Sequence, residues 1–72
     1  MEIARKTAKS GKVYRIWEDS GVFSMYTIEF LKMYHYNDGT SCNCWMPAYE
    51  PKQKIFTSIT DVRQAFEDFL NN

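Results

Sequence analysis

The sequence predicts an α+β fold: a four-stranded antiparallel β-meander with one C-terminal α-helix packed on one face. Residues 12–57 alternate segments rich in β-branched and aromatic residues with turns that contain Gly, Asn or Asp, which is typical of short antiparallel strands. Residues 59–70 instead repeat apolar residues at helical spacing. With 72 residues the chain can form one small domain, near the lower limit at which a core stabilises itself.

Residues 1–11 are polar and basic and end in Ser-Gly, so we expect a flexible basic arm in which Glu2–Ala4 can form a short edge strand. Residues 12–72 then make up the single α+β domain. The first fifteen residues hold five basic groups against one acidic group, whereas residues 16–50 hold one basic group against five acidic ones. The whole chain is neutral, so no overall field directs it to nucleic acid or to a membrane.

Four strands are expected, separated by two tight turns and one loop. They are placed over 12–19, 22–37, 40–46 and 53–57. The second is longer than an ordinary strand, so we expect a bulge or bend at residues 29–31. Asp38-Gly39 is the strongest hairpin signal, and we expect Gly39 at positive φ. Pro47 ends the third strand or places it at an edge of the sheet.

Two-residue turns at 20–21 and 38–39 fix a register, and the register divides the strands between two faces. In this register Tyr34 lies opposite Asn43. One face is soft and apolar and suits the helix. The other combines rings with a few polar groups: Trp17, Tyr26, Tyr34, Tyr36 and Trp45 with Arg15, Lys32 and Asn43. We therefore expect one face to form the core and the other to be partly exposed.

The helix over 59–70 has the clearest pattern in the chain. Ser58 and Asp61 are close to a capping box, which favours a helix start at this point. The apolar positions are Ile59, Val62, Phe66, Phe69 and Leu70, with Ala65 between them. We expect them to cover Ile16, Met25, Met33, Cys44 and Phe56.

Chemical sites are weakly supported. His35, Cys42 and Cys44 share the apolar face in this register, and imidazole and thiolate groups are zinc ligands. A fourth ligand is missing, so we interpret them as two buried thiols beside a histidine and expect no metal and no cofactor. A catalytic Cys–His pair facing the helix would lack substrate access. The carboxylate pairs at 18–19 and 67–68 are adjacent and solvated, and no Gly-rich phosphate loop is present. We expect no enzymatic activity.

The cysteine content and hydropathy predict the compartment. Two cysteines two positions apart form no disulfide framework. No apolar run follows the basic N-terminal residues, and no segment approaches the roughly 20 apolar residues of a membrane span. We therefore expect a cytoplasmic protein with no membrane partner.

The aromatic face is the more specific signal. Tyr and Trp beside Arg or Asn are typical of protein-binding hot spots. We expect protein contact through Trp17, Tyr26, Tyr34, Tyr36 and Trp45, with Tyr49 at the edge. The alternative is a nucleic-acid-binding module that stacks bases on the same rings and holds phosphates with Arg5, Lys6, Lys9 and Arg15. A third interpretation is that the rings cover the sheet or pack in a homodimer.

The segment from Lys54 to Phe66, following an antiparallel meander, resembles the endings of very small proteins encoded by phages and mobile elements, such as anti-CRISPR proteins and other inhibitors of host defence. The resemblance covers 12–70 in outline and 54–69 in pattern, and it transfers no functional residue. It implies a non-enzymatic inhibitor or adaptor in the host cytoplasm that occupies a surface on a host or bacterial protein complex.

A second resemblance is to the three-stranded arm-binding domain of phage integrases, whose sheet enters the major groove before a similar final helix. It implies DNA binding. The central strands depart from that pattern, because beyond Arg15 they offer only Lys32 as a basic residue. A nucleic-acid partner is therefore the weaker expectation.

Overall fold

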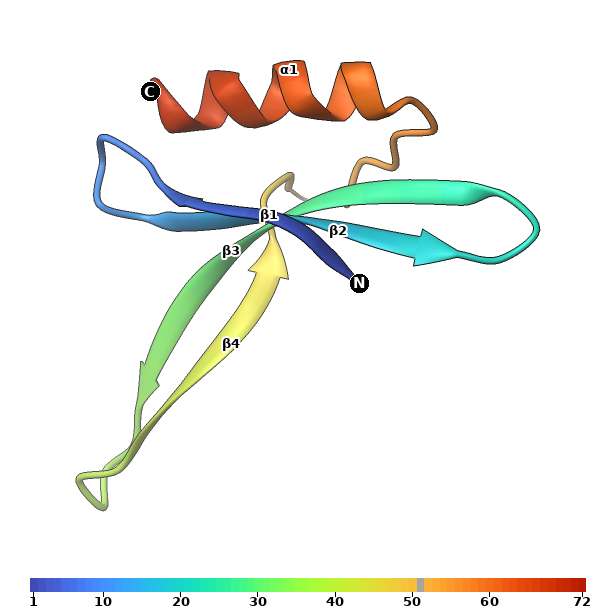
Figure 1. The fold of residues 1–72 in the computed structure, drawn as a ribbon. Helices are drawn as coiled ribbons and strands as arrows, with labels where there is room; N and C mark the ends of the chain where they lie inside the picture. Colours follow the sequence, from blue (N-terminus) through green and yellow to red (C-terminus); the bar gives the residue numbers. More distant parts are fainter. Residues whose placement is uncertain (51) are drawn as a thin grey trace.

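The computed structural model of the chain describes residues 1–50 and 52–72. Four strands form one antiparallel sheet in the order β1-β2-β3-β4, and one helix follows them. The elements are β1 (Glu2–Thr7), β2 (Val13–Ser20), β3 (Ser24–His35), β4 (Ser41–Pro47) and α1 (Ile59–Leu70). The helix lies along one face of the sheet and contacts β2 and β3 (Figure 1). The predicted α+β meander with a C-terminal helix is confirmed.

The first strand of the sheet lies within the segment that was expected to be a flexible arm. β1 pairs with β2 along its length, so residues 2–7 belong to the sheet. The sequence indicated only a short edge strand over Glu2–Ala4, because the polar residues 5–7 that extend β1 produce no apolar alternation. The predicted strand at 53–57 is wrong. Only Phe56 pairs there, in an isolated bridge to Tyr26 with backbone hydrogen bonds of 2.7 and 2.8 Å.

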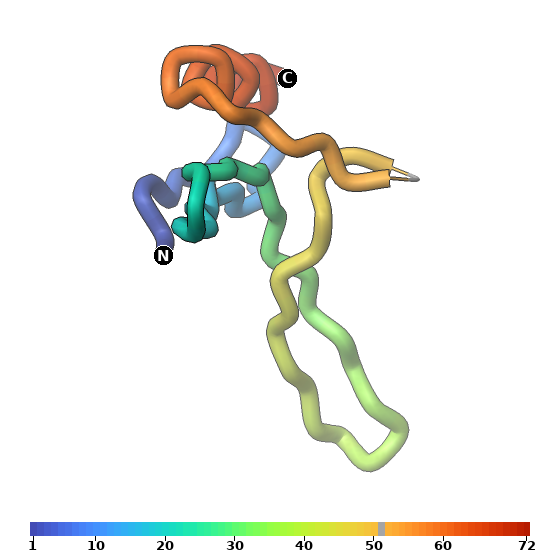
Figure 2. The backbone as a smooth tube through the Cα atoms, turned by 90° about the vertical axis from the view of Figure 1, so that its right-hand side faces the viewer, coloured from blue at the N-terminus to red at the C-terminus, as the bar shows by residue number. Residues whose placement is uncertain are grey.

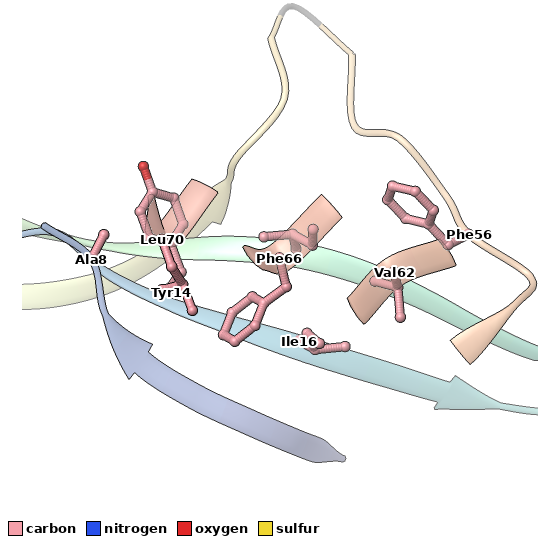
Figure 3. Close-up of a cluster of buried hydrophobic side chains, with 8 residues drawn as sticks. Ala8, Tyr14, Ile16, Phe56, Val62, Phe66 and Leu70 are labelled. Atoms are coloured by element: carbon pink, nitrogen blue, oxygen red, sulfur yellow. The ribbon is translucent and has the colours of Figure 1, made fainter. Parts of the chain in front are cut away.

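The core lies between α1 and the part of the sheet formed by β2 and the first half of β3 (Figure 3). The buried apolar residues are Ala8, Tyr14, Ile16, Ile28, Phe56, Val62, Phe66 and Leu70. The predicted contribution of Ile16 and Phe56 is thus confirmed. Met25 and Met33 were expected under the helix but are 42% and 54% exposed. The expectation for Cys44 is also wrong, since it lies outside this core.

The predicted start of the helix is confirmed. Ser58 is the N-cap, and its side chain accepts a hydrogen bond of 3.3 Å from the backbone N–H of Asp61. This bond satisfies one of the backbone donors that a helix leaves free in its first turn. The acidic side chain of Asp61 also lies where the helix dipole favours negative charge.

Both hairpin turns contain three residues where two were expected. Between β3 and β4 the turn is 37–39, because Tyr36 donates a backbone hydrogen bond of 2.9 Å to Thr40. Gly39 has φ 88°, which confirms the expected positive φ. Tyr34 consequently faces Cys42 and not Asn43. The predicted register of this hairpin is therefore wrong by one residue.

The turn between β2 and β3 consists of residues 21–23, which shifts the second register by three positions. Arg15 faces Glu29, whereas a turn at 20–21 would have placed it opposite Tyr26. Because side chains alternate between the two faces of a strand, an odd shift moves every residue of one strand to the other face relative to its neighbour. Both registers differ from the predicted ones by an odd number of residues, so both differences change which side chains share a face.

The second half of β3 leaves the helix-covered part of the molecule. β3 pairs with β2 from Ser24 to Phe30 and with β4 from Glu29 to His35, so its two halves have different neighbours. The strand curves where pairing changes partner, at the expected bend, and the register shows no bulge there. Residues 31–45, named here the projecting hairpin, extend away from α1 (Figure 2).

Candidate protein-contact face of the sheet

The face of the sheet opposite α1 carries an arginine stacked between two tryptophans. Trp17 comes from β2 and Trp45 from β4. The Cζ atom of Arg15 lies 4.5 Å from the ring centroid of Trp17 and 4.1 Å from that of Trp45. Arg5 from β1 adds a third contact, with its Cζ atom 5.1 Å from the Trp45 ring. Three strands thus build one cluster.

Two glutamates hold the arginines in place. The Nε atom of Arg15 donates to Glu29 Oε1 at 2.8 Å, across the β2–β3 pair. Glu2 Oε1 lies 2.8 Å from Nη2 of Arg5 and 3.9 Å from Nη1 of Arg15. The Arg15 side chain is only 15% exposed. Stacking on the two rings and charge-assisted hydrogen bonds together fix the position of its guanidinium group. We name this cluster the open face, and its residues are Glu2, Arg5, Arg15, Trp17, Glu29 and Trp45.

The open face is electrically balanced and its side chains are held by stacking and ion pairs. Both tryptophans remain partly exposed, and Trp17 Nε1 donates to Asp19 at 3.3 Å. Two arginines neutralise two glutamates, so the cluster presents no net charge. The described part of the chain contains no pocket. This arrangement is suited to contact with another surface and has no cavity in which a small substrate would be enclosed.

The structure brings together only two of the six predicted contact residues. Trp17 and Trp45 share the open face, whereas the odd register shifts place the tyrosines of β3 on the opposite face. There Tyr26 packs against the core. Tyr34 donates a hydrogen bond of 3.6 Å to the sulfur of Met46. The expected single face of five rings is therefore wrong.

The other two predicted contact residues also lie away from the open face. Tyr36, just beyond β3, has its hydroxyl 3.2 Å from Cys42 Sγ, and this contact raises the pKa of the phenol. Tyr49 was expected at the edge of the aromatic face. It packs instead beside Phe56 and Phe69, with ring centroids 6.1 and 5.1 Å away. The pKa of Tyr49 is raised, mainly because the phenol is buried and secondly because the carboxylate of Asp68 is nearby.

The four basic residues of the nucleic-acid alternative do not form one patch. Arg5 and Arg15 lie on the open face and are both paired with carboxylates. Lys6 lies opposite Tyr14, which places it on the helix side of the sheet. Lys9 follows β1, and its backbone N–H donates to the carbonyl of Leu70 at 3.1 Å. Their charges therefore point to separate regions.

Sequence reasoning missed Glu2 and Glu29 as members of the site. Glu2 was placed in the basic arm, in the short edge strand considered for Glu2–Ala4, and Glu29 was placed at a bend. The signal that finds them is charge complementarity across strands: with the observed register, Arg15 faces Glu29 directly. That signal appears only once the length of the 21–23 turn is known.

The predicted cluster of His35, Cys42 and Cys44 is also divided by the one-residue change of register between β3 and β4. His35 faces Ser41, whereas Cys42 and Cys44 point to the opposite side of the hairpin. The expectation of three side chains on one helix-covered face is wrong, and both thiols are partly exposed. Their sulfur atoms lie 3.9 Å apart, and the contact with Cys42 raises the pKa of Cys44. The described residues contain no group of three or more His, Cys, Asp and Glu side chains arranged for a metal ion.

Comparison with protein-family models, with curated proteins and with solved structures finds no match. The helix of the described chain has neither the length nor the apolar character needed to span a bilayer.

Proposed function

We propose that this chain is a small non-enzymatic protein-binding inhibitor or adaptor, and that the open face of its sheet is the contact surface. The stack of Trp17, Arg15 and Trp45 carries the proposal. Tryptophan and arginine are the residues most enriched among binding hot spots, where large side chains are held rigidly near the centre of an interface. Here the stacking and ion pairs order these side chains before any partner binds, which lowers the entropy cost of association.

The partner that suits such a surface is another protein. In the described part of the chain the face has no pocket, which suits the broad surfaces of protein complexes better than a small molecule. The resemblance of residues 54–69 to phage-encoded anti-defence proteins gives the proposal its particular form. The chain blocks a host complex in the bacterial cytoplasm, as an anti-CRISPR or related inhibitor, by occupying part of its surface.

The charges on the open face favour protein over nucleic acid. Each arginine already has a carboxylate partner within 2.8 Å, so a phosphate would compete with Glu2 and Glu29 for the same guanidinium groups. The same pairing leaves neither glutamate free to act as a general base, which supports a non-enzymatic role. A protein partner can contact the partly exposed tryptophans without breaking these pairs.

The test compares variants on the two faces of the sheet. Tagged protein is used to recover its partner from a bacterial lysate, with nuclease treatment, and the purified pair is then measured by calorimetry. Trp17→Ala and Trp45→Ala should each weaken binding by at least about 30-fold, a hot-spot effect of roughly 2 kcal/mol. Tyr34→Ala, on the opposite face, is the matched control and should bind like the parent. Circular dichroism verifies that each variant is folded.

Two results would contradict the proposal. One is a partner that binds both tryptophan variants as tightly as the parent. The other is recovery of nucleic acid alone, eluting with a log–log salt slope of about −3 to −4, the value expected for roughly four phosphate contacts. Binding of a protein at an interface of stacked rings should instead change little with salt.

A further inference from the structure

The projecting hairpin carries an exposed dithiol that the open face does not use. Cys42 and Cys44 occupy alternate positions of β4, so both side chains lie on the side opposite Trp45. Their Sγ atoms are 3.9 Å apart, and both residues are partly exposed. Met46 continues the same row with a third sulfur. The helix does not cover this part of the sheet (Figure 2).

The distance between the thiols is close to that needed for shared coordination of one metal ion. With metal–sulfur bonds of about 2.3 Å, two thiolates on one ion lie roughly 3.8 Å apart in tetrahedral geometry and about 4.6 Å apart when linear. The observed 3.9 Å is close to the tetrahedral value, and a linear two-coordinate ion would require the sulfur atoms to separate by about 0.7 Å more. A disulfide would need the same atoms at about 2.05 Å, which requires a larger change of conformation. Chelation of one ion therefore needs a smaller movement of the two side chains than closure of a disulfide.

The composition of the site selects a soft, monovalent ion. Thiolate and thioether ligands favour copper(I), whereas zinc usually completes a tetrahedron with further Cys, His or carboxylate ligands. Within the described residues no third group of that kind joins Cys42 and Cys44. His35 is the single histidine of the sequence, and it projects from the other side of the hairpin. Two sulfurs suffice for a two-coordinate ion.

One lysine lies on the same side of the hairpin as the two thiols. Lys32 of β3 lies directly opposite Cys44, on the same side of the hairpin, with its Nζ atom 5.2 Å from the Tyr34 ring. Binding of copper(I) replaces two S–H protons by two S–Cu bonds and leaves one net negative charge on the complex. The flexible side chain of Lys32 can move toward the complex and partly offset this charge.

We propose that Cys42 and Cys44 form a two-thiolate binding site for one copper(I) ion. The site is independent of the proposed protein contact, because it lies on the opposite side of β4 from Trp45. It also differs from the zinc cluster considered from the sequence, which required His35 on the same face. A thiophilic ion at this position would tie the two cysteine side chains together on an otherwise solvent-exposed strand.

The test titrates reduced, full-length protein with copper(I) buffered by bicinchoninate under anaerobic conditions. We expect one copper per chain. Cys42→Ser and Cys44→Ser should each lower the affinity by at least about a hundredfold, because a single thiol loses the chelate effect. His35→Ala and Met33→Leu, on the other side of the same hairpin, should bind like the parent. Silver(I), a redox-inert probe, should shift amide NMR signals within residues 41–46.

Three results would overturn the proposal. The first is a single-cysteine variant that retains parental affinity while remaining folded by circular dichroism. The second is a marked loss of affinity in His35→Ala, which would mean that the hairpin register differs from the one described. The third is tight binding of one zinc per two chains with dimer formation, which would assign the thiols to a shared four-sulfur site.

Discussion

Arg15 is the residue on which the open face depends most. Its guanidinium contacts two tryptophan rings and donates to Glu29 at 2.8 Å, and its side chain is 15% exposed. A planar, delocalised cation can stack and form directional hydrogen bonds at the same time. Lysine carries the same charge but has no planar group that can stack between two rings, so this position requires arginine.

Arg15→Lys should lower the free energy of unfolding by about 1–2 kcal/mol, because the stacking on two rings is lost while the charge remains. Urea denaturation measures the difference. Arg5→Lys is the matched control, since the Arg5 side chain is 53% exposed, and it should change stability by less than about 0.5 kcal/mol. Equal stability of Arg15→Lys and the parent would show that the stack contributes nothing.

Asp38 is the second residue whose surroundings give a prediction. Its carboxylate accepts hydrogen bonds from the Thr40 hydroxyl at 2.6 Å and the Thr40 backbone N–H at 2.9 Å, and these bonds lower the pKa of Asp38. Since the folded pKa is lowered, the contribution to stability is present above the ordinary aspartate pKa and is lost as pH falls through the folded pKa. The turn should therefore weaken in acid.

Thr40→Val removes the hydroxyl and should raise the pKa of Asp38 toward its ordinary value, because the hydroxyl bond is the largest cause of the shift. NMR titration of the side-chain carboxyl carbon measures this change. Thr57→Val, outside the hairpin, should leave the Asp38 titration unchanged. If the Asp38 titration in Thr40→Val matches that of the parent, the hydroxyl bond does not form in solution.

Among the elements, the projecting hairpin depends most on its turn. Residues 37–39 join β3 to β4, and Gly39 has φ 88°, a conformation that residues with a Cβ atom rarely adopt. A Cβ atom built on Gly39 meets no heavy atom within 4 Å. A substitution there is therefore strained through its backbone conformation and not through a clash.

Gly39→Val should destabilise the hairpin by about 1–2 kcal/mol, the cost of a left-handed conformation for a residue with a side chain. The amide of Tyr36, which donates to Thr40, should exchange faster with solvent. Gly21→Val is the control, because Gly21 has open space and no positive φ, and it should be nearly neutral. If both variants exchange alike, the turn at 37–39 has a different conformation.

The whole molecule is divided between a buried part and two exposed ends. The core lies between α1, β2 and β3, and Ile16, Ile28 and Val62 are fully buried there. The turn at 21–23 instead exposes Val22 and Phe23 at 91% and 77%, and the projecting hairpin extends away from the helix. The burial of apolar side chains that stabilises the fold is therefore concentrated in one small cluster.

Phe66→Ala should lower the free energy of unfolding by roughly 3–5 kcal/mol, enough to unfold a domain of this size, because it removes a ring from the core. Phe66 is 4% exposed. Phe23→Ala removes the same ring from an exposed turn and should change the thermal midpoint little. A Phe66→Ala protein that melts like Phe23→Ala would show that α1 is not packed as described.

The sequence by itself determined the features that depend on near neighbours. Helical spacing and the Ser58 cap located α1, and Asp38-Gly39 located a turn with positive φ at Gly39. The order of the main strands also followed, because turn residues separate them. Such signals extend over only a few residues, so local chemistry is sufficient to establish them.

Only the tertiary structure decided which side chains meet. Both hairpin turns have three residues instead of two. The resulting registers place the tyrosines of β3 on the face opposite Trp17 and Trp45, and they separate His35 from the cysteines. The same structure recruited residues 2–7 as an edge strand and left Phe56 with a single bridge. The physical reason is that side chains alternate with period two, so register is set by contacts across the sheet that a linear pattern does not contain.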